Sequence, residues 1–269
     1  MKTIVISGGT DGMGRAIALE RLDRGDTVVA IGSNAAKGQA LVDQAGDRLE
    51  FIQADLSSIA ETERVIDRVN RSYSTVDALL LFANRQYPKR LETAAGLEHT
   101  FALYYLSRYL LAQGLRPALD ASPDPVIVSV AGVGNTAGSI SWDDLQLTRG
   151  YRMVRAQLQA GRANDLLAAG YTGKARFVLY HPGFTRSGDL SPLHPAIRFL
   201  IRALGKVAAR PVAAAIGPIH GFLDQPPKPQ LTAIDRGKPV DLSLKTLDRA
   251  DALRLAEATE KLLRARQTD

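Results

Sequence analysis

The stretch 2–24 constrains the fold of this chain more than any other, because a short β-branched run leads at once into glycines and then into a helical apolar pattern. Residues Thr3–Ser7 have the composition of a buried strand. Glycine lets a backbone approach a pyrophosphate closely, and a helix N-terminus presents free N–H groups and a positive dipole end. The stretch therefore predicts a dinucleotide cradle rather than a plain tight turn. The residues that carry this prediction are Gly8, Gly9, Gly12, Gly14, Ala16, Ile17, Ala18 and Leu22.

Length and composition fit one large α/β domain. The 269 residues contain no low-complexity linker, and an apolar content of 45% supplies a sizeable core. The absence of cysteine excludes disulfides and thiolate chemistry. The net charge of +6 is spread along the chain without an aromatic platform, which favours an ordinary basic surface over nucleic-acid binding. We expect a cytoplasmic protein without stable membrane insertion, because a strand begins at residue 3 and no apolar run reaches ~18 residues.

Apolar runs alternate with helical patterns along the rest of the chain. This alternation predicts a Rossmann-type α/β fold, a doubly wound parallel sheet with helices on both faces, in a single domain that spans 1–269. The continuous apolar run at 78–82 is typical of a parallel strand buried on both faces. The predicted strands are 3–7, 27–31, 49–54, 78–82, 126–130, 176–180 and 231–234. One predicted helix follows the glycines, and the others cover 59–72, 97–115 and 156–169.

The end of the second predicted strand bears on the choice of cofactor. Folds that bind NAD place an acid here to hold the ribose hydroxyls, but this chain has Gly32, Ser33 and Asn34. Arg15 and Lys37 lie nearby in the sequence and would attract a 2′-phosphate. We therefore expect NADP(H) to be favoured over NAD(H). The alternative is that both cations are solvated charges on helix faces.

Several motifs together resemble the short-chain dehydrogenase/reductase (SDR) family over nearly the whole chain. They are the glycine spacing, Asp55, the 78–82 run and the His-Pro-Gly turn at 181–183. The segments 96–98, 143–146, 163–164 and 248–263 are most similar to the retinol-dehydrogenase-like branch. The resemblance implies hydride transfer between a nicotinamide and a carbonyl or alcohol carbon. It also implies a catalytic tyrosine tuned by a lysine, a serine that holds the carbonyl oxygen, and an asparagine that positions a water.

All four of these catalytic positions carry other residues here. Alignment on the motifs places Gly132 at the serine, Gln157 at the tyrosine, Gly161 at the lysine and Tyr104 at the asparagine. The Asn-Asn-Ala-Gly motif of the family falls on 81–84, which retains only Ala83. The resemblance therefore implies a proton donor different from the usual one.

The cofactor positions match the family better than the catalytic ones do. The resemblance and the glycine turn assign cofactor binding to Gly8, Gly12, Met13, Gly14, Arg15, Ser33, Asn34, Asp55, Leu56, Ala83, Asn84, Pro182, Gly183, Thr185 and Ser187. No histidine has the spacing of a metal ligand, so no metal site is expected. His181 is interpreted as a hydrogen-bonded packing residue at a strand end.

The candidate catalytic residues are Tyr151, Arg155, Gln157 and Tyr104. Tyr151 and Arg155 form a shifted Tyr-x-x-x-Arg pair, although motif alignment makes Tyr151 a structural tyrosine. The leading hypothesis is a biosynthetic NADP(H)-dependent oxidoreductase acting on a small apolar ketone or alcohol. The alternatives are a non-redox enzyme (a cyclase, isomerase or hydro-lyase) and a cofactor-binding pseudoenzyme without chemistry.

The C-terminal third is expected to contain a substrate lid at 190–225 and a terminal helix at 246–266. Cations recur every four residues from 198 to 210 beside apolar residues, which predicts a basic amphipathic helix. We expect this helix to pack on the pocket, and contact with a membrane surface or a partner is the alternative. The resemblance leaves a homo-oligomer open.

Overall fold

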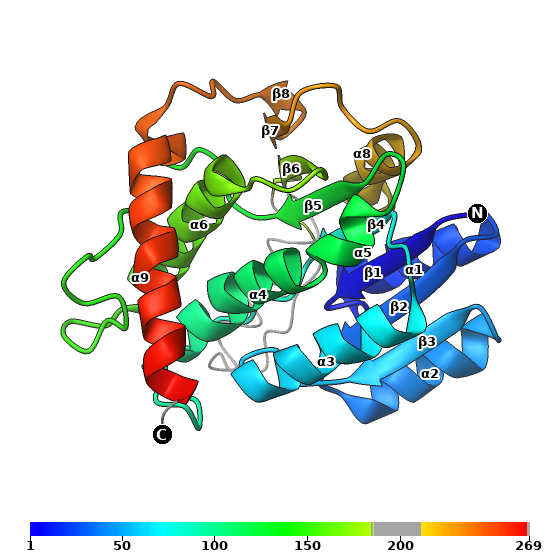
Figure 1. Ribbon diagram of the computed structural model, residues 1–269, viewed down its shortest axis with the longest axis horizontal. Coiled ribbons are helices and arrows are strands. Elements are labelled where there is room, and N and C mark those ends of the chain that lie inside the picture. Colours follow the sequence, from blue (N-terminus) through cyan, green and yellow to red (C-terminus); the bar gives the residue numbers. More distant parts are fainter. Residues whose placement is uncertain (184, 186–210, 268–269) are drawn as a thin grey trace.

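The computed structural model describes residues 1–183, 185 and 211–267. Within these residues eight strands form one sheet in the order β3-β2-β1-β4-β5-β6-β7-β8 (Figure 1). Neighbouring strands from β3 through β7 are parallel, and β8 pairs antiparallel with β7. The predicted Rossmann-type sheet is confirmed. The strands are β1 (Thr3–Ser7), β2 (Thr27–Gly32), β3 (Leu49–Gln53), β4 (Ala78–Leu81), β5 (Val126–Val130), β6 (Arg176–His181), β7 (Leu231–Asp235) and β8 (Lys238–Pro239).

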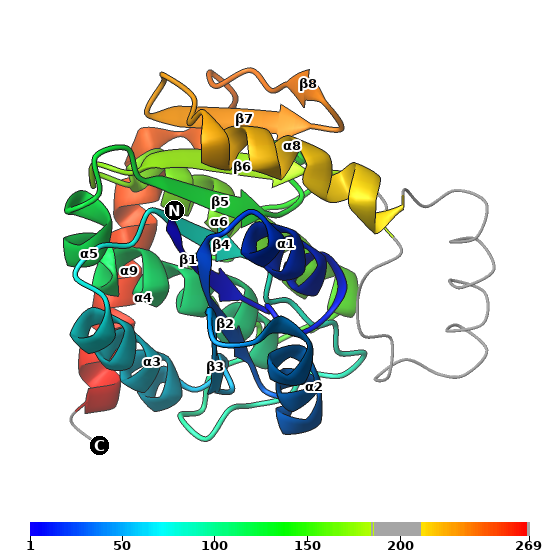
Figure 2. The same ribbon diagram turned by 90° about the vertical axis from the view of Figure 1, so that its right-hand side faces the viewer.

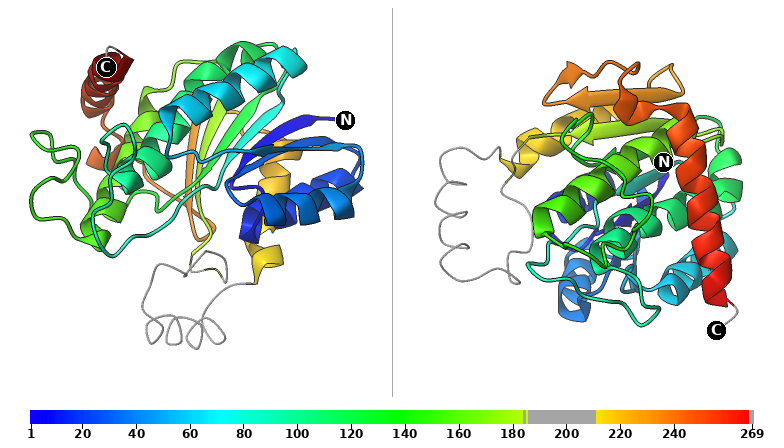
Figure 3. Two further views of the ribbon diagram at one scale, coloured as in Figure 1. Left: turned by 90° about the horizontal axis from the view of Figure 1, so that it is seen from below. Right: turned by 90° about the vertical axis from the view of Figure 1, so that its left-hand side faces the viewer.

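Helices cover both faces of the sheet, which is visible in the view from below (Figure 3). One layer contains α1 (Gly12–Asp23), α2 (Ala35–Ala45) and α8 (Val212–Asp224). The other contains α3 (Ile59–Ser72), α4 (Ser107–Gly114), α5 (Arg116–Asp120), α6 (Met153–Gly170) and α9 (Arg249–Gln267).

The strands are apolar on both sides because each side faces a helix layer. In β1, Val5 packs in the core beneath α3, α4 and α6, whereas Ile4 and Ile6 pack in the core beneath α1 and α8. In the sheet, β2 lies next to β1 on one side and β4 lies next to β1 on the other, so the strand order reverses at β1 (Figure 2). This reversal opens a crevice at the carboxyl ends of β1 and β4, where open α/β sheets bind ligands.

The long helix expected over 97–115 begins later and has an irregular first turn. The buried carboxylate of Glu98 accepts hydrogen bonds from the backbone amides of Thr100 (2.8 Å) and Phe101 (2.7 Å), which fixes the start. The helix begins at residue 99, its segment Phe101–Leu106 is π-helical, and α4 and then α5 follow it. A π-helical turn places one extra residue in the helix and often occurs at functional sites.

The predicted lid and C-terminal helix are covered in part. Residues 190–210, and Ser187 before them, lie outside the described residues. Residues 212–224 of the predicted lid form α8, which packs against α1 and the sheet. The Tyr180 hydroxyl of β6 donates a hydrogen bond to the Ala215 carbonyl of α8 at 2.9 Å. The helix predicted at 246–266 corresponds to α9, which lies along α6 (Figure 1). None of the helices in the described residues is long and apolar enough to cross a bilayer.

Candidate functional site

A cavity of about 920 Å³ opens at the carboxyl edge of the sheet. The turn after β1, the ends of β2, β4, β5 and β6, and one face of α6 enclose it. Its volume lies in the range of small-molecule sites, roughly 300–1,000 Å³. The predicted site residues that line it are Gly8, Gly12, Met13, Gly14, Ser33, Asn34, Asp55, Leu56, Ala83, Asn84, Tyr104, Gln157, Pro182, Gly183 and Thr185.

The glycine turn is packed too closely for side chains. A Cβ on Gly14 would lie 2.1 Å from the Gly8 carbonyl oxygen, and one on Gly8 would lie 2.9 Å from the Ala83 amide nitrogen. Gly8 also has a left-handed φ of +70°. These glycines therefore let the first turn of α1 face the cavity with bare backbone. A phosphate fits such a turn, because backbone N–H groups and the helix dipole are both directed at it.

Two charged side chains lie together at the end of this turn that faces β2. Asp11 caps α1 by accepting a hydrogen bond from the Gly12 amide at 2.8 Å, and it forms an ion pair with Lys37. Burial acts to raise the pKa of Asp11, but the hydrogen bonds from Lys37 and Gly12 lower it overall. Lys37 lines the cavity beside Ser33 and Asn34, in agreement with the expected placement near the end of β2.

Arg15, the other cation expected near a 2′-phosphate, points elsewhere. It begins the outer face of α1, and its guanidinium donates to the Gln44 side chain of α2. The structure therefore brings Lys37, and not Arg15, to the cavity wall.

The positions that the family resemblance assigns to serine and lysine are glycines that face each other. A Cβ on Gly132 would meet nothing within 4 Å, and one on Gly161 would lie 3.9 Å from the Gly132 carbonyl oxygen. At the tyrosine position, the Gln157 side chain bonds the Asn84 amide at 3.0 Å and the Arg85 carbonyl at 3.3 Å. This wall of the cavity therefore holds an uncharged amide pair in place of an ionisable phenol and an amine.

Tyr104 projects from the π-helical turn to the cavity, and its hydroxyl lies against the Gly132 backbone amide. The turn leaves the Tyr104 carbonyl free for the Asn164 side chain, which donates to it at 2.8 Å. Burial raises the pKa of the Tyr104 phenol, while the charge of Arg108 and the hydrogen bond from Gly132 oppose that rise. The phenol therefore stays protonated near neutral pH.

Arg108 is a fully buried cation behind Tyr104. Its guanidinium carbon lies 4.7 Å from the centre of the Tyr104 ring. It donates to the Ser129 hydroxyl at 2.7 Å and to the carbonyls of Val130 (3.1 Å) and Ala83 (3.3 Å). No carboxylate contacts it in the part of the chain that the structure describes, and burial lowers its pKa to about 10. The sequence analysis did not single out this residue, because its helical position looks like that of an exposed arginine.

The shifted pair Tyr151 and Arg155 does not meet at the cavity. The Tyr151 hydroxyl donates to the Tyr87 carbonyl at 2.9 Å, and burial raises the pKa of the phenol. Arg155 donates to the carbonyls of Arg149 and Gly150, both at 3.2 Å, at the start of α6. The two groups are thus bound by separate partners, which favours Tyr104 over Tyr151 as the phenol of the site.

His181 is hydrogen-bonded at its strand end, as the sequence suggested, but it also lines the cavity. Its Nδ1 lies 2.7 Å from Oδ1 of Asp235 at the end of β7, and its ring lines the cavity. The partners are 54 positions apart in the sequence, and their contact depends on the pairing of β6 with β7. Among the described residues, no three His, Cys, Asp or Glu side chains are arranged to hold a metal.

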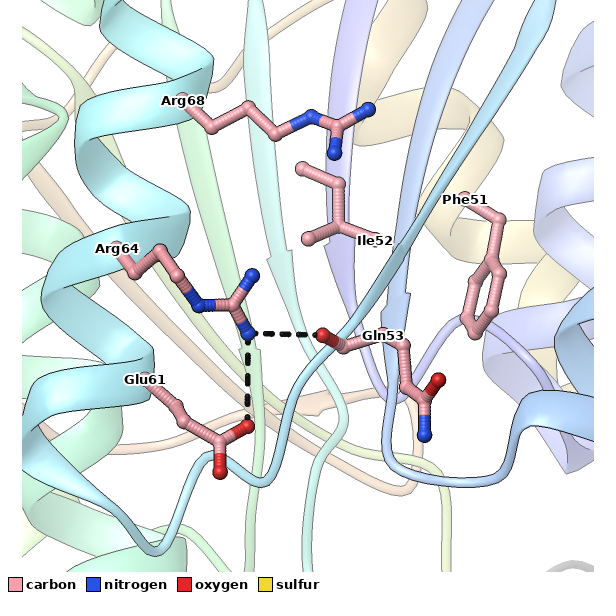
Figure 4. Close-up of a pocket in the computed structure, with 6 residues that line it drawn as sticks. All are labelled: Phe51, Ile52, Gln53, Glu61, Arg64 and Arg68. Atoms are coloured by element: carbon pink, nitrogen blue, oxygen red, sulfur yellow. Dashed lines mark hydrogen bonds and ion pairs between the residues drawn. The ribbon is translucent and has the colours of Figure 1, made fainter.

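A second hollow, of about 710 Å³, lies between β3 and α3 (Figure 4). Its cations already have partners: Arg64 donates to the Gln53 carbonyl at 3.1 Å, and Arg68 contacts Glu50 at 2.6 Å. The glycine turn and the strand ends that could hold a dinucleotide lie at the other cavity, which is therefore the candidate site.

The chain belongs to the short-chain dehydrogenase family, since the family model for short chain dehydrogenases matches residues 2–143. Oxidoreductase calI of Penicillium decumbens is 31% identical over 62% of this chain and 52% of its own length. Human retinol dehydrogenase 13 is 27% identical over 84% of this chain and 69% of its own. The chain spans about half the length of several curated relatives that it matches.

Solved structures agree on the fold. A 3-ketoacyl-(acyl-carrier-protein) reductase from Brucella melitensis, in complex with NADH, superposes with a TM-score of 0.65. The match is 17% identical and covers 88% of this chain and 98% of the other. At this identity the likeness establishes the architecture and no more.

Proposed function

We propose that the protein is an NADP(H)-binding oxidoreductase that interconverts a small apolar ketone and its alcohol. Family membership, the glycine turn and the open cavity at the strand ends support this proposal. The cavity wall near Tyr104 is apolar, with Leu103, Val130 and Ala131 among its members, which suits an apolar substrate. A bound reduced nicotinamide would supply the hydride.

The residues of the chain fit a dinucleotide. The space over Gly8 and Gly14 excludes side chains but accepts an anion at the N-terminus of α1. Ser33, Asn34 and Lys37 would hold a 2′-phosphate; no carboxylate follows β2, and the carboxylate of Asp11 in the same cavity is paired with Lys37. Asp55 and Leu56 would flank the adenine, and Pro182, Gly183 and Thr185 the nicotinamide carboxamide.

One observation carries the chemical part of the proposal: Tyr104 lines the cavity together with Gly132, where the family resemblance expects a serine hydroxyl. A protonated phenol at this place would donate a hydrogen bond to a substrate carbonyl oxygen and would stabilise the negative charge that develops there. The guanidinium of Arg108 over its ring makes the phenol a better donor.

The experiment that tests this role compares Tyr104→Phe with Tyr105→Phe. The Tyr105 hydroxyl contacts Thr259 at 2.8 Å beneath α9, so its removal spares the cavity. We expect Tyr104→Phe to lower kcat for an apolar ketone about 10²–10³-fold without changing NADPH affinity. Equal loss in the two variants would contradict the role.

The replacement of all four family catalytic groups favours one second candidate, a non-redox enzyme on the same scaffold. A cyclase, isomerase or hydro-lyase would use the same phenol and amide pair without hydride transfer. Tight NADPH binding without oxidation across a ketone panel would favour this reading or that of a pseudoenzyme. A cytoplasmic, biosynthetic role and a homo-oligomer remain part of the proposal, to be tested by fractionation and by sedimentation.

A further inference from the structure

His181 and Asp235 form an oriented histidine–carboxylate pair in the cavity. They are opposite each other in the register of β6 and β7, and Nδ1 of the imidazole lies 2.7 Å from the carboxylate. Arg236 holds the same carboxylate, with Nη2 2.9 Å from Oδ2. The hydrogen bonds and charges of Arg236 and His181 lower the pKa of Asp235 although burial opposes them, so the carboxylate stays ionised.

Strand alternation directs the imidazole toward α6. Phe177 and Leu179 of β6 pack in the core that contains α4 and α6, whereas Val178 and Tyr180 pack in the core that contains α1 and α8. His181 continues the first series, on the side of the sheet where α6 carries Gln157 and Gly161. The imidazole therefore lies on the same side of the sheet as the positions where the family resemblance expects the tyrosine and the lysine, and it lines the cavity together with Gln157.

The carboxylate determines what the imidazole can do. A carboxylate at Nδ1 fixes the N–H on that nitrogen, so that Nε2 is the atom that takes up and releases a proton. Within the described residues Asp235 is the hydrogen-bond partner of this ring, and the side chain of His181 is 37% exposed and lines the cavity. Tyr104 is protonated through the neutral range and does not supply this exchange.

We propose that His181, oriented by Asp235, is the acid–base residue of this cavity. During reduction, Nε2–H of the imidazolium would give its proton to the substrate oxygen as the hydride reaches the carbonyl carbon. The N–H bond breaks, an O–H bond forms from the carbonyl π pair, and the neutral imidazole recovers a proton from water. Oxidation of the alcohol is the reverse. This inference rests on the proposed function and names the proton carrier that the function lacks.

A second histidine–carboxylate pair provides the comparison. His220 of α8 and Glu20 of α1 are 2.6 Å apart, but the pair joins two helices of the layer on the other side of the sheet and does not line the cavity. Its imidazole–carboxylate distance is similar to that of His181 with Asp235, although Nε2 rather than Nδ1 of the ring faces the carboxylate. It serves as the matched control.

The kinetic test compares His181→Asn with His220→Asn. Asparagine keeps an N–H for the neighbouring carboxylate but cannot carry a proton. We expect His181→Asn to lower kcat about 10²–10⁴-fold, to keep the NADPH affinity measured by fluorescence within twofold, and to regain rate with added imidazole. His220→Asn should keep the wild-type kcat. A wild-type kcat in His181→Asn would overturn the inference.

A second test needs no activity and separates failure of the inference from failure of the proposed function. The ¹⁵N spectrum of the His181 ring in the ligand-free chain should show Nδ1 protonated and Nε2 bare in the neutral form, and Asp235→Asn should abolish that preference. Identical ring spectra in the two proteins would overturn the oriented pair, whatever the turnover. NADPH binding by the wild type with no ketone reduction, together with the expected spectra, would instead contradict the oxidoreductase assignment.

Discussion

The side-chain amides of Asn84 and Gln157 are bonded to each other: Nδ2 of Asn84 donates to Oε1 of Gln157 at 3.0 Å, and Nε2 of Gln157 donates back at 3.3 Å. They join the end of β4 to the face of α6 across the wall of the cavity. An amide pair transfers no proton near neutral pH. The amide pair occupies the position where the family resemblance expects the catalytic phenol.

Gln157→Ala should therefore have a small effect on catalysis. Because Asn84 loses a half-exposed partner, we expect the free energy of unfolding to fall by about 0.5–1.5 kcal/mol. We expect kcat to fall by less than about tenfold. Urea unfolding and steady-state kinetics measure the two. Gln39→Ala, which removes an exposed bond to Asp43, is the control. A hundredfold fall in kcat would mean that Gln157 itself handles the substrate.

Gly14→Ala should abolish cofactor binding by disrupting the turn. Its Cβ would lie 2.1 Å from the Gly8 carbonyl, a backbone atom that cannot move without opening the turn. Gly221→Ala is the control, because a Cβ at that helical position meets nothing within 4 Å and should stabilise α8 by up to ~1 kcal/mol. NADPH fluorescence titration and thermal melting measure both. Undiminished NADPH binding by Gly14→Ala would show that this glycine turn does not bind the cofactor.

Lys37→Met should weaken NADPH binding about 10–100-fold and leave NADH binding unchanged, because a charge-assisted contact with the 2′-phosphate is lost. Arg15→Met should change neither, since Arg15 is directed at Gln44. Ser33→Asp should reverse the preference by placing a carboxylate at the end of β2. Equal affinities for the two dinucleotides in the wild type would contradict the predicted NADP(H) preference.

Asp165 should make stability depend on pH. Burial raises the pKa of its carboxyl to about 7, against an ordinary value of 3.8. The folded state then binds the proton more tightly than the unfolded state does. The stabilisation is present below pH ~4 and is lost as the pH rises to ~7. Asp165→Asn keeps an acceptor for the Gly134 amide and carries no charge, so it should be about 2–4 kcal/mol more stable than the wild type above pH 7.

The same comparison near pH 4 should show no difference between Asp165→Asn and the wild type. Urea unfolding at both pH values measures this, with Asp241→Asn, at an exposed turn, as the control. A difference that is constant with pH would show that Asp165 is ionised throughout.

The sequence predicted the parts of the fold that depend on local pattern. The strand at 126–130 and the helix at 59–72 have the expected bounds, because each is an uninterrupted apolar pattern with a clear start. The helix expected from 97 begins at 99, because capping by the buried carboxylate of Glu98 depends on tertiary burial. The glycine turn was predictable for the same local reason as the strands.

The wall of the cavity was less predictable, because its contacts join segments that are distant in the sequence. Gln157 meets Asn84 across 73 residues, and His181 meets Asp235 across 54. Motif spacing also gave Tyr151 and Arg155 as a pair, but each is bound by backbone carbonyls elsewhere. Only the arrangement of strand ends and of the π-helical turn distinguishes Tyr104 from the other tyrosines.

Transfer of deuterium from C4-deuterated NADPH to a small apolar ketone such as cyclohexanone is the direct test of the proposed oxidoreductase activity. The wild type should yield an alcohol deuterated at the carbinol carbon, whereas Gly14→Ala should yield none. NADPH that binds tightly at the cavity but transfers no deuterium to any ketone of a panel would contradict the proposed activity.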